Sequence, residues 1–376
     1  MTDSKNRTKE LYTLPHASSV EEGGRLDGQH NMLKILLDGL FPCPELVAKV
    51  MMDEEGRAKS VLDLGSGSGA WCMDVANQFP QAQVVGIDIA PNLQRDTSNC
   101  RFELWDINQG LSPFHGQFDL VHVRFIHGIV NHHNLTLEAI KCLKPGGLII
   151  FLRVGPIVTD DRTTLMPAAS SRMPDQSWYQ RFWSFVELGS TQRGLPAEIY
   201  NHDYDEGFWD HDTMDAKTCG AAFITIPLGA WVTTSDPAET ARLRTIGKFW
   251  AENAMRIHRH LDHVMSSAGR SEKDIELLHT HLDNELQTTR IRSSMIIRAI
   301  WGCSQSVEDA NSRNHSPPRD EDAPLPLLSN EPGEYRVITI FDNKPTWTKF
   351  NAQLMSTMTP DTKKLRGIPG FDPIEA

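Results

Sequence analysis

The stretch VLDLGSGSGAW, from Val61 to Trp71, decides the fold of this 376-residue chain. Its apolar first half predicts a buried strand, and glycines follow at Gly65, Gly67 and Gly69 before a helix begins. Glycine is needed where the backbone turns with positive φ or lies close to a ligand. The N–H groups at the start of the next helix can then hold a polar ligand. The pattern predicts a ligand-binding loop of Gly65, Ser66, Gly67 and Gly69.

Short β-rich runs alternate with helix-length segments around this loop. The predicted strands are Ser60–Leu64, Gln83–Asp88, Arg101–Leu104, Phe118–Val123, Leu148–Arg153, Ala222–Pro227 and Ser294–Trp301. The main predicted helices are Leu26–Leu40, Pro44–Met52, Ala70–Phe79, Leu135–Leu143, Glu239–Ser266 and Lys273–Thr289. Strand–helix alternation predicts βαβ units and a mainly parallel sheet, which the nearly continuous apolar strands would bury on both faces. The expected fold is therefore α/β, with a doubly wound, mostly parallel seven-stranded sheet.

The rest of the chain adds predicted parts before, within and after this sheet. Residues 1–24 form a flexible arm, and residues 25–303 form the α/β domain with a helical, aromatic cap inserted at about 156–220. Residues 304–376 are polar and rich in proline, which indicates a flexible extension. Within this extension, Arg336–Phe341 (RVITIF) has the pattern of one more strand, without an identifiable partner.

The cap contains an aromatic segment, Gln176–Leu188, which is apolar on more than one face. This pattern predicts a helix wedged into the core. It also fits a cover for a substrate pocket, in which Trp178, Tyr179 and Trp183 stack on a flat or cationic molecule. The two interpretations are compatible.

Two acidic residues follow the strands next to the glycine loop. An acid at Asp88, at the end of the second strand, is placed to bind ribose hydroxyls. Asp106 follows the third strand and can reach an adenine amino group, while the apolar faces of Ile89 and Ile107 can flank the ring. These residues predict a nucleoside-containing ligand.

The loop also fits a dinucleotide fingerprint, Gly65-x-Gly67-x-x-Ala70, which on its own is a weak signal. Asp63 helps to separate the alternatives, because a carboxylate just before the first glycine opposes a pyrophosphate. It suits the ammonium group of a methionine moiety, directly or through water. A nicotinamide or flavin ligand is therefore the weaker alternative.

The charge of the chain bears on its partners. Acidic residues outnumber basic residues by 49 to 37, which gives a formal net charge of −12. This balance repels phosphate backbones and anionic membranes, and no dense Lys/Arg run offsets it, so neither nucleic acid nor membrane is expected as a partner. The polar start MTDSKNRTKE does not resemble a signal peptide, and the six cysteines are scattered. We expect a soluble cytoplasmic protein, with nuclear entry left open.

Five segments, in this order, resemble class I S-adenosylmethionine-dependent methyltransferases. LDLGSGSG resembles their first motif, GIDIAP their ribose-binding turn, WDIN their adenine-contact segment, FDLVHVRFIH their fourth strand and LKPGG the turn before the fifth. The resemblance covers about residues 25–301. It implies a Rossmann-like methyltransferase fold, S-adenosyl-L-methionine as cofactor, and methyl transfer from the sulfonium to a nucleophile.

More narrowly, the chain is similar to the fungal methyltransferases that include the velvet-complex regulators of secondary metabolism. RLDGQH (Arg25–His30) resembles the RL-x-x-QH opening of that group, and IPLGAW (Ile226–Trp231) its later strand and turn. The opening segment lies over the cofactor in that group, so the resemblance implies that Gln29 and His30 contact it. FDLVHVR matches the arginine-bearing fourth strand, which adds Arg124 to the cofactor-binding candidates. The extension after Ser304 departs from the group's pattern.

Catalysis by such a domain rests mainly on holding nucleophile, methyl group and sulfur in line. A general base helps when the acceptor is a hydroxyl or a protonated amine. His127 follows the fourth strand and is the candidate base because histidine titrates near neutral pH, although a structural role for it stays open. No metal is expected, since His122, His127, His132 and His133 lack the i, i+4 spacing of a zinc pair.

Three functions follow from these observations. The first is an enzyme that methylates a small molecule, in keeping with a secondary-metabolism setting. The second is a regulatory, methyltransferase-like protein that keeps the cofactor pocket and acts through protein partners. The third is a nicotinamide-dependent oxidoreductase, which Asp63 and the five ordered motifs disfavour.

Overall fold

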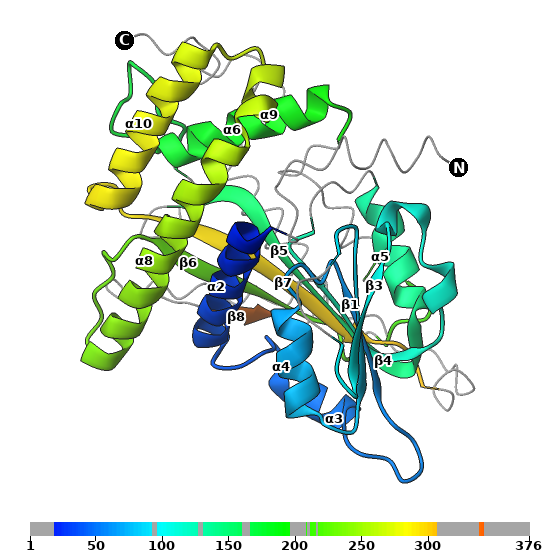
Figure 1. The fold of residues 1–376 in the computed structure, drawn as a ribbon. Coiled ribbons are helices and arrows are strands. Elements are labelled where there is room, and N and C mark those ends of the chain that lie inside the picture. The colour runs from blue at the N-terminus through cyan, green and yellow to red at the C-terminus, as the bar shows by residue number, and fades with distance from the viewer. Residues whose placement is uncertain are drawn as a thin grey trace, which may run out of the picture.

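The computed structural model describes residues 19–91, 96–126, 131–159, 166–195, 208, 211–215, 217–306 and 338–341. Eight strands within these residues form one sheet in the order β3-β2-β1-β4-β5-β7-β6-β8 (Figure 1). Their bounds are β1 Ser60–Leu64, β2 Gln83–Asp88, β3 Cys100–Leu104, β4 Phe118–Arg124, β5 Leu143–Thr159, β6 Gly220–Leu228, β7 Ser293–Cys303 and β8 Ile338–Phe341. Strands β1 to β5 pair in parallel, whereas β7, β6 and β8 continue the sheet with antiparallel pairs.

This arrangement confirms the predicted α/β class and the mostly parallel, doubly wound sheet. The number of strands differs from the seven expected, because β8 is added along β6 at the edge of the sheet. The segment whose partner the sequence did not reveal therefore pairs with β6. Helices cover both faces of the sheet: α2 (Val20–Leu37), α3 (Pro44–Val50), α4 (Ala70–Gln78), α5 (His132–Lys141), α6 (Trp178–Gln192), α8 (Pro237–His260), α9 (Asp262–Ser267) and α10 (Glu272–Thr288).

Alternating side chains of the central strands pack into two apolar layers, one on each face of the sheet. Along β1, Val61 belongs to the layer shared with α2, α4 and α8, while Leu62 and Leu64 belong to the layer shared with α5. All three side chains are fully buried. Alternation follows from the pleat of the strand, which directs successive side chains to opposite faces. The two-sided burial explains why these strands are apolar along their whole length.

The largest differences from the predicted helix boundaries are at α2 and α8. Helix α2 begins at Val20, inside the predicted arm, because the Ser19 hydroxyl caps it by accepting the Glu22 N–H at 3.2 Å. The remainder of the arm, residues 1–18, lies outside the described residues. The predicted helix Glu239–Ser266 is two helices, since α8 ends at His260 and α9 begins after the buried Leu261.

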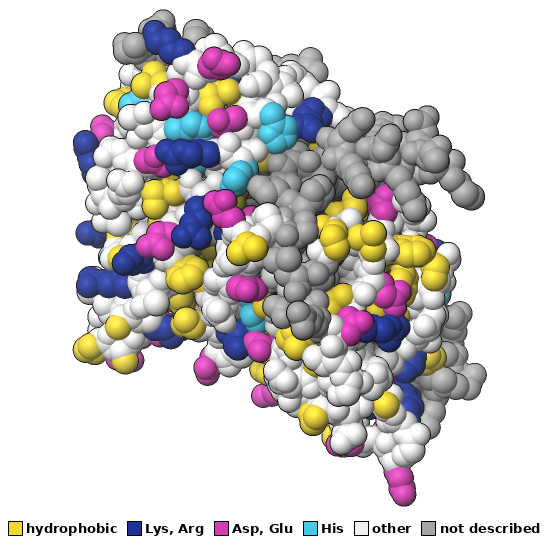
Figure 2. Space-filling view, viewed as in Figure 1, with side chains coloured by type: hydrophobic (Ala, Val, Ile, Leu, Met, Phe, Trp, Pro, Cys, Tyr) yellow, Lys and Arg dark blue, Asp and Glu magenta, His cyan; other side chains and the backbone are white. Residues whose placement is uncertain are grey.

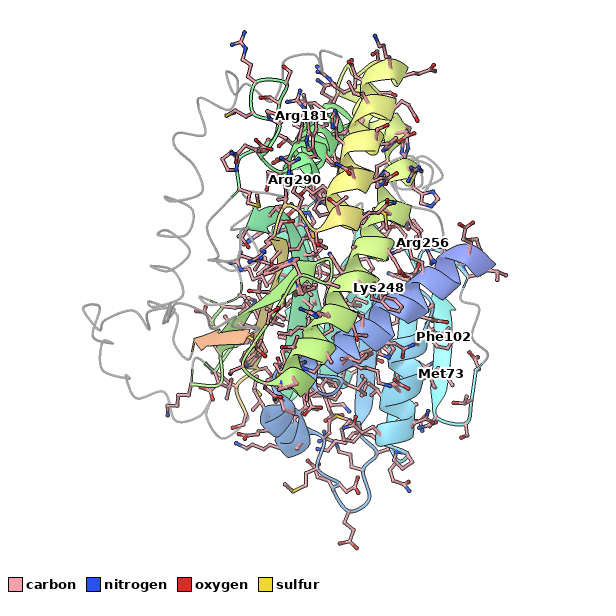
Figure 3. All side chains as sticks on the ribbon, turned by 90° about the vertical axis from the view of Figure 1, so that its left-hand side faces the viewer. Met73, Phe102, Arg181, Lys248, Arg256 and Arg290 are labelled. Atoms are coloured by element: carbon pink, nitrogen blue, oxygen red, sulfur yellow. The ribbon has the colours of Figure 1, made fainter. Side chains whose placement is uncertain are left out.

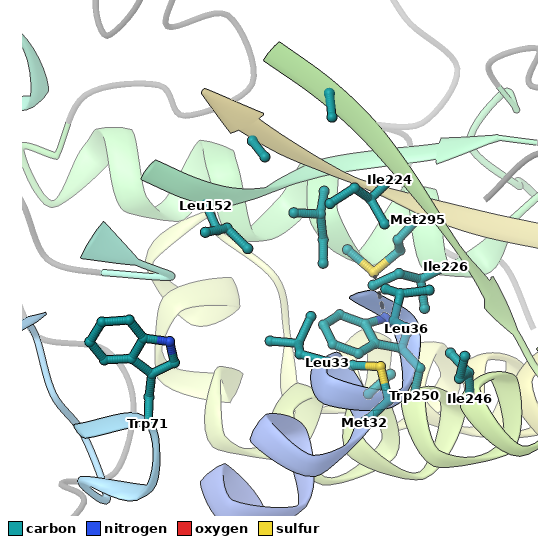
Figure 4. Packing of buried hydrophobic residues seen from close by; sticks show 14 of the residues in the cluster. Met32, Leu33, Leu36, Trp71, Leu152, Ile224, Ile226, Ile246, Trp250 and Met295 are labelled. Atoms are coloured by element: carbon teal, nitrogen blue, oxygen red, sulfur yellow. Dashed lines mark hydrogen bonds between the residues drawn. The ribbon is translucent and has the colours of Figure 1, made fainter. Parts of the chain in front are cut away.

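Helices α2 and α8 lie side by side over one face of the sheet (Figures 1 and 3). The outer side of α8 carries the exposed Lys248 and Arg256 (Figure 3), while Trp250 points inward. The Trp250 indole N–H donates to Met295 Sδ of β7 at 3.0 Å, among Leu33 and Leu36 of α2 (Figure 4). An apolar core thus joins α2 to the antiparallel half of the sheet.

The helices α6, α9 and α10 form the cap beyond the sheet (Figure 1). The first turn of α6 is fixed by α10, because the Glu285 carboxylate accepts the backbone N–H groups of Trp178 at 2.6 Å and Tyr179 at 3.2 Å. The Ser177 hydroxyl also donates to Glu285 at 2.9 Å. Three hydrogen bonds to one buried side chain thus hold the first turn of α6 in place.

The surface carries both signs of charge. Figure 2 shows acidic and basic side chains interspersed over the α8 and α10 side of the molecule, on the left of the view. Among the helices that the structure describes, none is both long enough and apolar enough to span a membrane.

Candidate functional site

A cavity opens at the carboxyl ends of β1, β2, β3 and β4, under helix α2. This is the switch point of the fold, where the strand order reverses on either side of β1 and β4, and ligands of open α/β sheets bind at such points. The cavity has a polar half over these strand ends and an apolar half under the cap. The polar half is lined by Leu26, Gln29, Gly65, Ser66, Gly67, Ser68, Asp88, Ile89, Trp105, Asp106, Ile107, Asn108, Arg124, Phe125 and Ile126.

The glycine loop requires glycine at two positions of this lining. Gly65 has φ +72°, and a Cβ there would lie 2.8 Å from Ile126 Cγ1. Gly67 has φ +55°, and its Cβ would lie 3.2 Å from Leu26 Cδ1 of the overlying helix. Positive φ and close neighbours both disfavour any side chain here. Gly69 precedes α4 outside the cavity lining.

Asp88 is held by the loop that it faces. Its Oδ2 accepts the Gly67 N–H at 2.9 Å, and its Oδ1 accepts the Ala90 N–H at 3.0 Å. Burial raises the pKa of the Asp88 carboxyl, and these backbone hydrogen bonds oppose the rise. A carboxylate has about four lone-pair sites, so Asp88 can still accept a hydrogen bond from the cavity.

Asp106 and the two isoleucines follow the same edge. Asp106 Oδ1 accepts the Asn108 N–H at 3.0 Å, and Oδ2 accepts from Gln109 Nε2 at 3.0 Å, which fixes the carboxylate at the end of β3. Ile89 and Ile107 supply apolar lining beside it. Acid and apolar surface therefore alternate along the polar half, as a nucleoside requires.

Arg124, the last residue of β4, lines the cavity, and His30 and Asp74 hold its guanidinium from the side of α2 and α4. Its Nη1 lies 3.3 Å from His30 Nδ1, and His30 Nε2 lies 2.9 Å from Asp74 Oδ2. Burial and then the nearby Arg124 charge lower the pKa of His30 to about 4, so the imidazole is neutral and accepts from the arginine. His30 therefore acts through Arg124 and does not line the cavity, unlike its neighbour Gln29.

Asp63 is also set back from the cavity. Its Oδ1 lies 2.7 Å from His122 Nδ1, and the Cys72 thiol donates to its Oδ2 at 3.2 Å. His122 stacks on Trp71 with ring centroids 3.8 Å apart. Asp63 is 3% exposed and is absent from the described lining, so the structure shows it bracing β1 against β4.

The apolar half of the cavity is made by the cap, by α8 and by the long strands. Tyr179 and Trp183 of the aromatic helix line it, whereas Trp178 stacks on His281 with centroids 3.9 Å apart. Burial raises the pKa of the Tyr179 phenol well above its ordinary value, so the ring stays neutral. The remaining lining is Val154, Val186, Ser190, Leu195, Trp250, Asn253, Ile257, Leu261 and Met295.

The contribution of α8 to the site was not predicted. Three of its lining residues, Trp250, Asn253 and Ile257, recur every three or four positions along the helix, and Leu261 follows directly after the helix ends. That spacing is the ordinary pattern of a core-facing helix. The one signal within it is Asn253, a polar residue on an otherwise apolar stripe.

An ion pair borders the two halves of the cavity. Arg25 donates to Glu22 through Nε at 2.7 Å and through Nη2 at 2.5 Å, and its Nη1 donates to Asn253 Oδ1 at 2.8 Å. The Arg25 and Glu22 side chains are only 6% and 5% exposed. This contact joins α2 to α8 above the cavity. The predicted base His127 lies outside the described residues.

Residues 55–185 match the model of a methyltransferase domain family. This range contains the glycine loop, Asp88, Asp106 and Arg124. The resemblance identified from the sequence motifs is thereby confirmed and outweighs the nicotinamide alternative.

The particular relatives are fungal. The secondary metabolism regulator LaeA of Coprinopsis cinerea is 35% identical over 147 residues, which are 38% of this chain and 36% of that protein. The methyltransferase str3 of Strobilurus tenacellus is 36% identical over 135 residues, 34% of this chain and 44% of that protein. The chain thus spans less than half the length of these relatives. Among solved structures, phosphoethanolamine N-methyltransferase 2 of Haemonchus contortus with S-adenosyl-L-methionine superposes with a TM-score of 0.36 and 14% identity, over 74% of this chain and 57% of that one.

Proposed function

We propose that this protein transfers the methyl group of S-adenosylmethionine to a small molecule of fungal secondary metabolism. The observation that carries the proposal is one continuous cavity with two chemically different halves. The polar half suits a charged nucleoside, and the apolar half suits a second, uncharged molecule. Bringing two reactants together in one enclosed site is the main requirement of methyl transfer.

The residues of the polar half fit the cofactor. Asp88 would accept from the ribose hydroxyls, and Ile89 and Ile107 would flank the adenine beside Asp106. Arg124, held by His30, would pair with the carboxylate of the methionine moiety. The Ser66 hydroxyl, which is 8% exposed and makes no hydrogen bond to any described residue, is a further donor in this lining.

The sulfonium of the bound cofactor supplies an already activated methyl group. The chain's own task is then to hold the acceptor in line and to exclude water, which the α2 and α6 helices do from two sides. Proton removal is needed only for some acceptors. His127 stays the proposed base for such acceptors.

A regulatory role is the second candidate. It is favoured by the relative named as a secondary metabolism regulator. Such a protein would retain the cofactor-binding residues and act through protein partners. The two candidates separate on turnover: an enzyme converts S-adenosylmethionine to S-adenosylhomocysteine when an acceptor is supplied, and a purely regulatory protein binds without conversion.

The Asp88→Ala variant tests the cofactor site. Its carboxylate is expected to accept charge-assisted hydrogen bonds from the ribose, whose loss costs about 1.5–3 kcal/mol. The dissociation constant for S-adenosylmethionine, measured by titration calorimetry, should therefore rise by roughly ten- to a hundredfold. Asp53→Ala, at an exposed aspartate away from the cavity, is the matched control and should bind as the parent protein does. Absence of binding by the parent protein, or tighter binding of the oxidised nicotinamide dinucleotide, would overturn the proposed function.

A further inference from the structure

Two buried hydrogen-bond donors in the apolar half of the cavity have no partner among the described residues, the indole N–H of Trp183 and the side-chain amide of Asn253. Asn253 is 5% exposed and lines the cavity, and its Nδ2 donates no hydrogen bond within the part of the chain that the structure describes. A buried amide without a partner is costly, and nearly all such groups in native proteins find one. The unused donor therefore points to a ligand atom that accepts from it.

The orientation of this amide is fixed by the protein. Arg25 Nη1 donates to Asn253 Oδ1 at 2.8 Å, and Glu22 in turn holds Arg25 through two hydrogen bonds. A guanidinium only donates, so the oxygen of the amide must face Arg25 and the NH₂ group must point away from it. The Asn253 side chain therefore offers its NH₂ group, and not its oxygen, to a ligand in the cavity.

Its position associates Asn253 with the second reactant. The residue lies between Trp250 and Ile257 on the stripe of α8 that lines the apolar half, whereas the loop, Asp88 and Asp106 line the polar half from the strand ends. The lining residues that come from α6, α8 and the long strands carry no carboxylate, ammonium or guanidinium group. Glu22 and Arg25 of α2 also line the cavity, and their charges compensate each other. An isolated ionic group would be strongly penalised there.

We propose that the methyl acceptor is an uncharged, mainly apolar small molecule whose carbonyl or ether oxygen accepts a hydrogen bond from Asn253 Nδ2. This inference rests on the proposed function, since it assigns the second half of the same cavity. Asn253 is then a residue that determines acceptor specificity. Trp183, Trp250 and Tyr179 supply flat surface for the apolar body of the molecule.

Three probes of nearly equal size separate the features of this acceptor. They are 2-acetylnaphthalene, 2-ethylnaphthalene, which lacks the oxygen, and 2-naphthoate, which carries a charge. Binding of each is measured by fluorescence titration to the full chain saturated with S-adenosylhomocysteine. A neutral hydrogen bond predicts that 2-acetylnaphthalene binds about three- to tenfold tighter than 2-ethylnaphthalene. The charged 2-naphthoate should bind weakest of the three.

Two variants remove the donor in different ways. Asn253→Asp keeps an oxygen for Arg25 but has no N–H to donate, and Asn253→Leu removes both groups at similar volume. Both are expected to lose the preference for 2-acetylnaphthalene over 2-ethylnaphthalene while the affinity for S-adenosylhomocysteine stays within about twofold in Asn253→Asp. Asn284→Leu, at an exposed asparagine of α10, is the matched control.

The outcomes distinguish this inference from the proposed function. A preference that survives in both Asn253 variants, or tighter binding of 2-naphthoate than of the neutral probes, would overturn the inference. So would an Asn253→Asp variant that loses S-adenosylhomocysteine affinity to the same extent as probe affinity, since the amide would then serve the cofactor. Failure of the parent protein to bind S-adenosylhomocysteine refutes the proposed function instead.

Discussion

Replacing Arg25 by alanine is expected to destabilise the protein by about 3–5 kcal/mol and to weaken cofactor binding in parallel. The substitution leaves the Glu22 carboxylate, 5% exposed, without the guanidinium that neutralises it. It also removes the hydrogen bond that joins α2 to Asn253 of α8. Denaturant unfolding gives the first effect, and calorimetric titration with S-adenosylhomocysteine gives the second.

A second Arg–Glu pair provides the control for this experiment. Arg242 donates through Nε and Nη2 to Glu239, also three residues away, and Nη1 reaches the backbone oxygen of Ile35 in α2. The side chains of Arg242 and Glu239 are 31% and 32% exposed, so solvent screens the pair. Arg242→Ala should therefore lower the free energy of unfolding by no more than about 1 kcal/mol. Equal losses in the two variants would show that burial does not govern the Arg25 pair.

The stability of the protein is expected to carry a pH dependence that originates at Glu285. Burial raises the pKa of this carboxyl from 4.5 to about 7, against the opposing effect of its hydrogen bonds from Ser177, Trp178 and Tyr179. Between those two pH values the folded protein retains a proton that the unfolded chain has released. The contribution of Glu285 is therefore fully present below about pH 4.5 and declines as the pH rises through 7, by about 3 kcal/mol in total.

The Glu285→Gln variant isolates this contribution because it cannot titrate. We expect the difference in unfolding free energy between the parent protein and the variant to shift by about 3 kcal/mol, against the parent, between pH 4.5 and pH 8. Glu276→Gln, at an exposed position of the same helix, should show no such shift. Parallel pH profiles for parent and Glu285→Gln would mean that the carboxyl titrates at its ordinary pKa in the folded state.

The sheet was predictable where strands are short, apolar and bounded by polar residues. Strands β1 and β2 have the predicted bounds. Strand β5 was predicted to run from Leu148 to Arg153, yet it runs from Leu143 to Thr159. Its pairing with β7 shifts register between Val154 and Val158, and such an irregularity accommodates a proline that cannot donate to the ladder.

The sequence predicted which residues lie at the strand ends, but not which of their side chains reach the cavity. Local spacing places the loop, Asp88 and Asp106 at adjacent strand ends, and the structure brings them to one cavity. The orientation of Asp63 depends on its contact with His122 of the neighbouring strand. The orientation of His30 depends in the same way on its contact with Asp74 of α4. Asn253 acquires its role only through Arg25, 228 positions away. Distances of this kind in sequence carry no local pattern.

That separation also orders events on the ribosome. The 18-residue helix α2 leaves the exit tunnel before α8, and alone in water a helix of this length is marginal. Its docking surface on α8 is synthesised 228 positions later, on the order of ten seconds or more at ordinary rates of translation. The glycine loop and Asp88 are complete long before then. The nascent chain therefore presents an open cofactor site to the surrounding solution, and α2 can close over this site only after α8 has been synthesised.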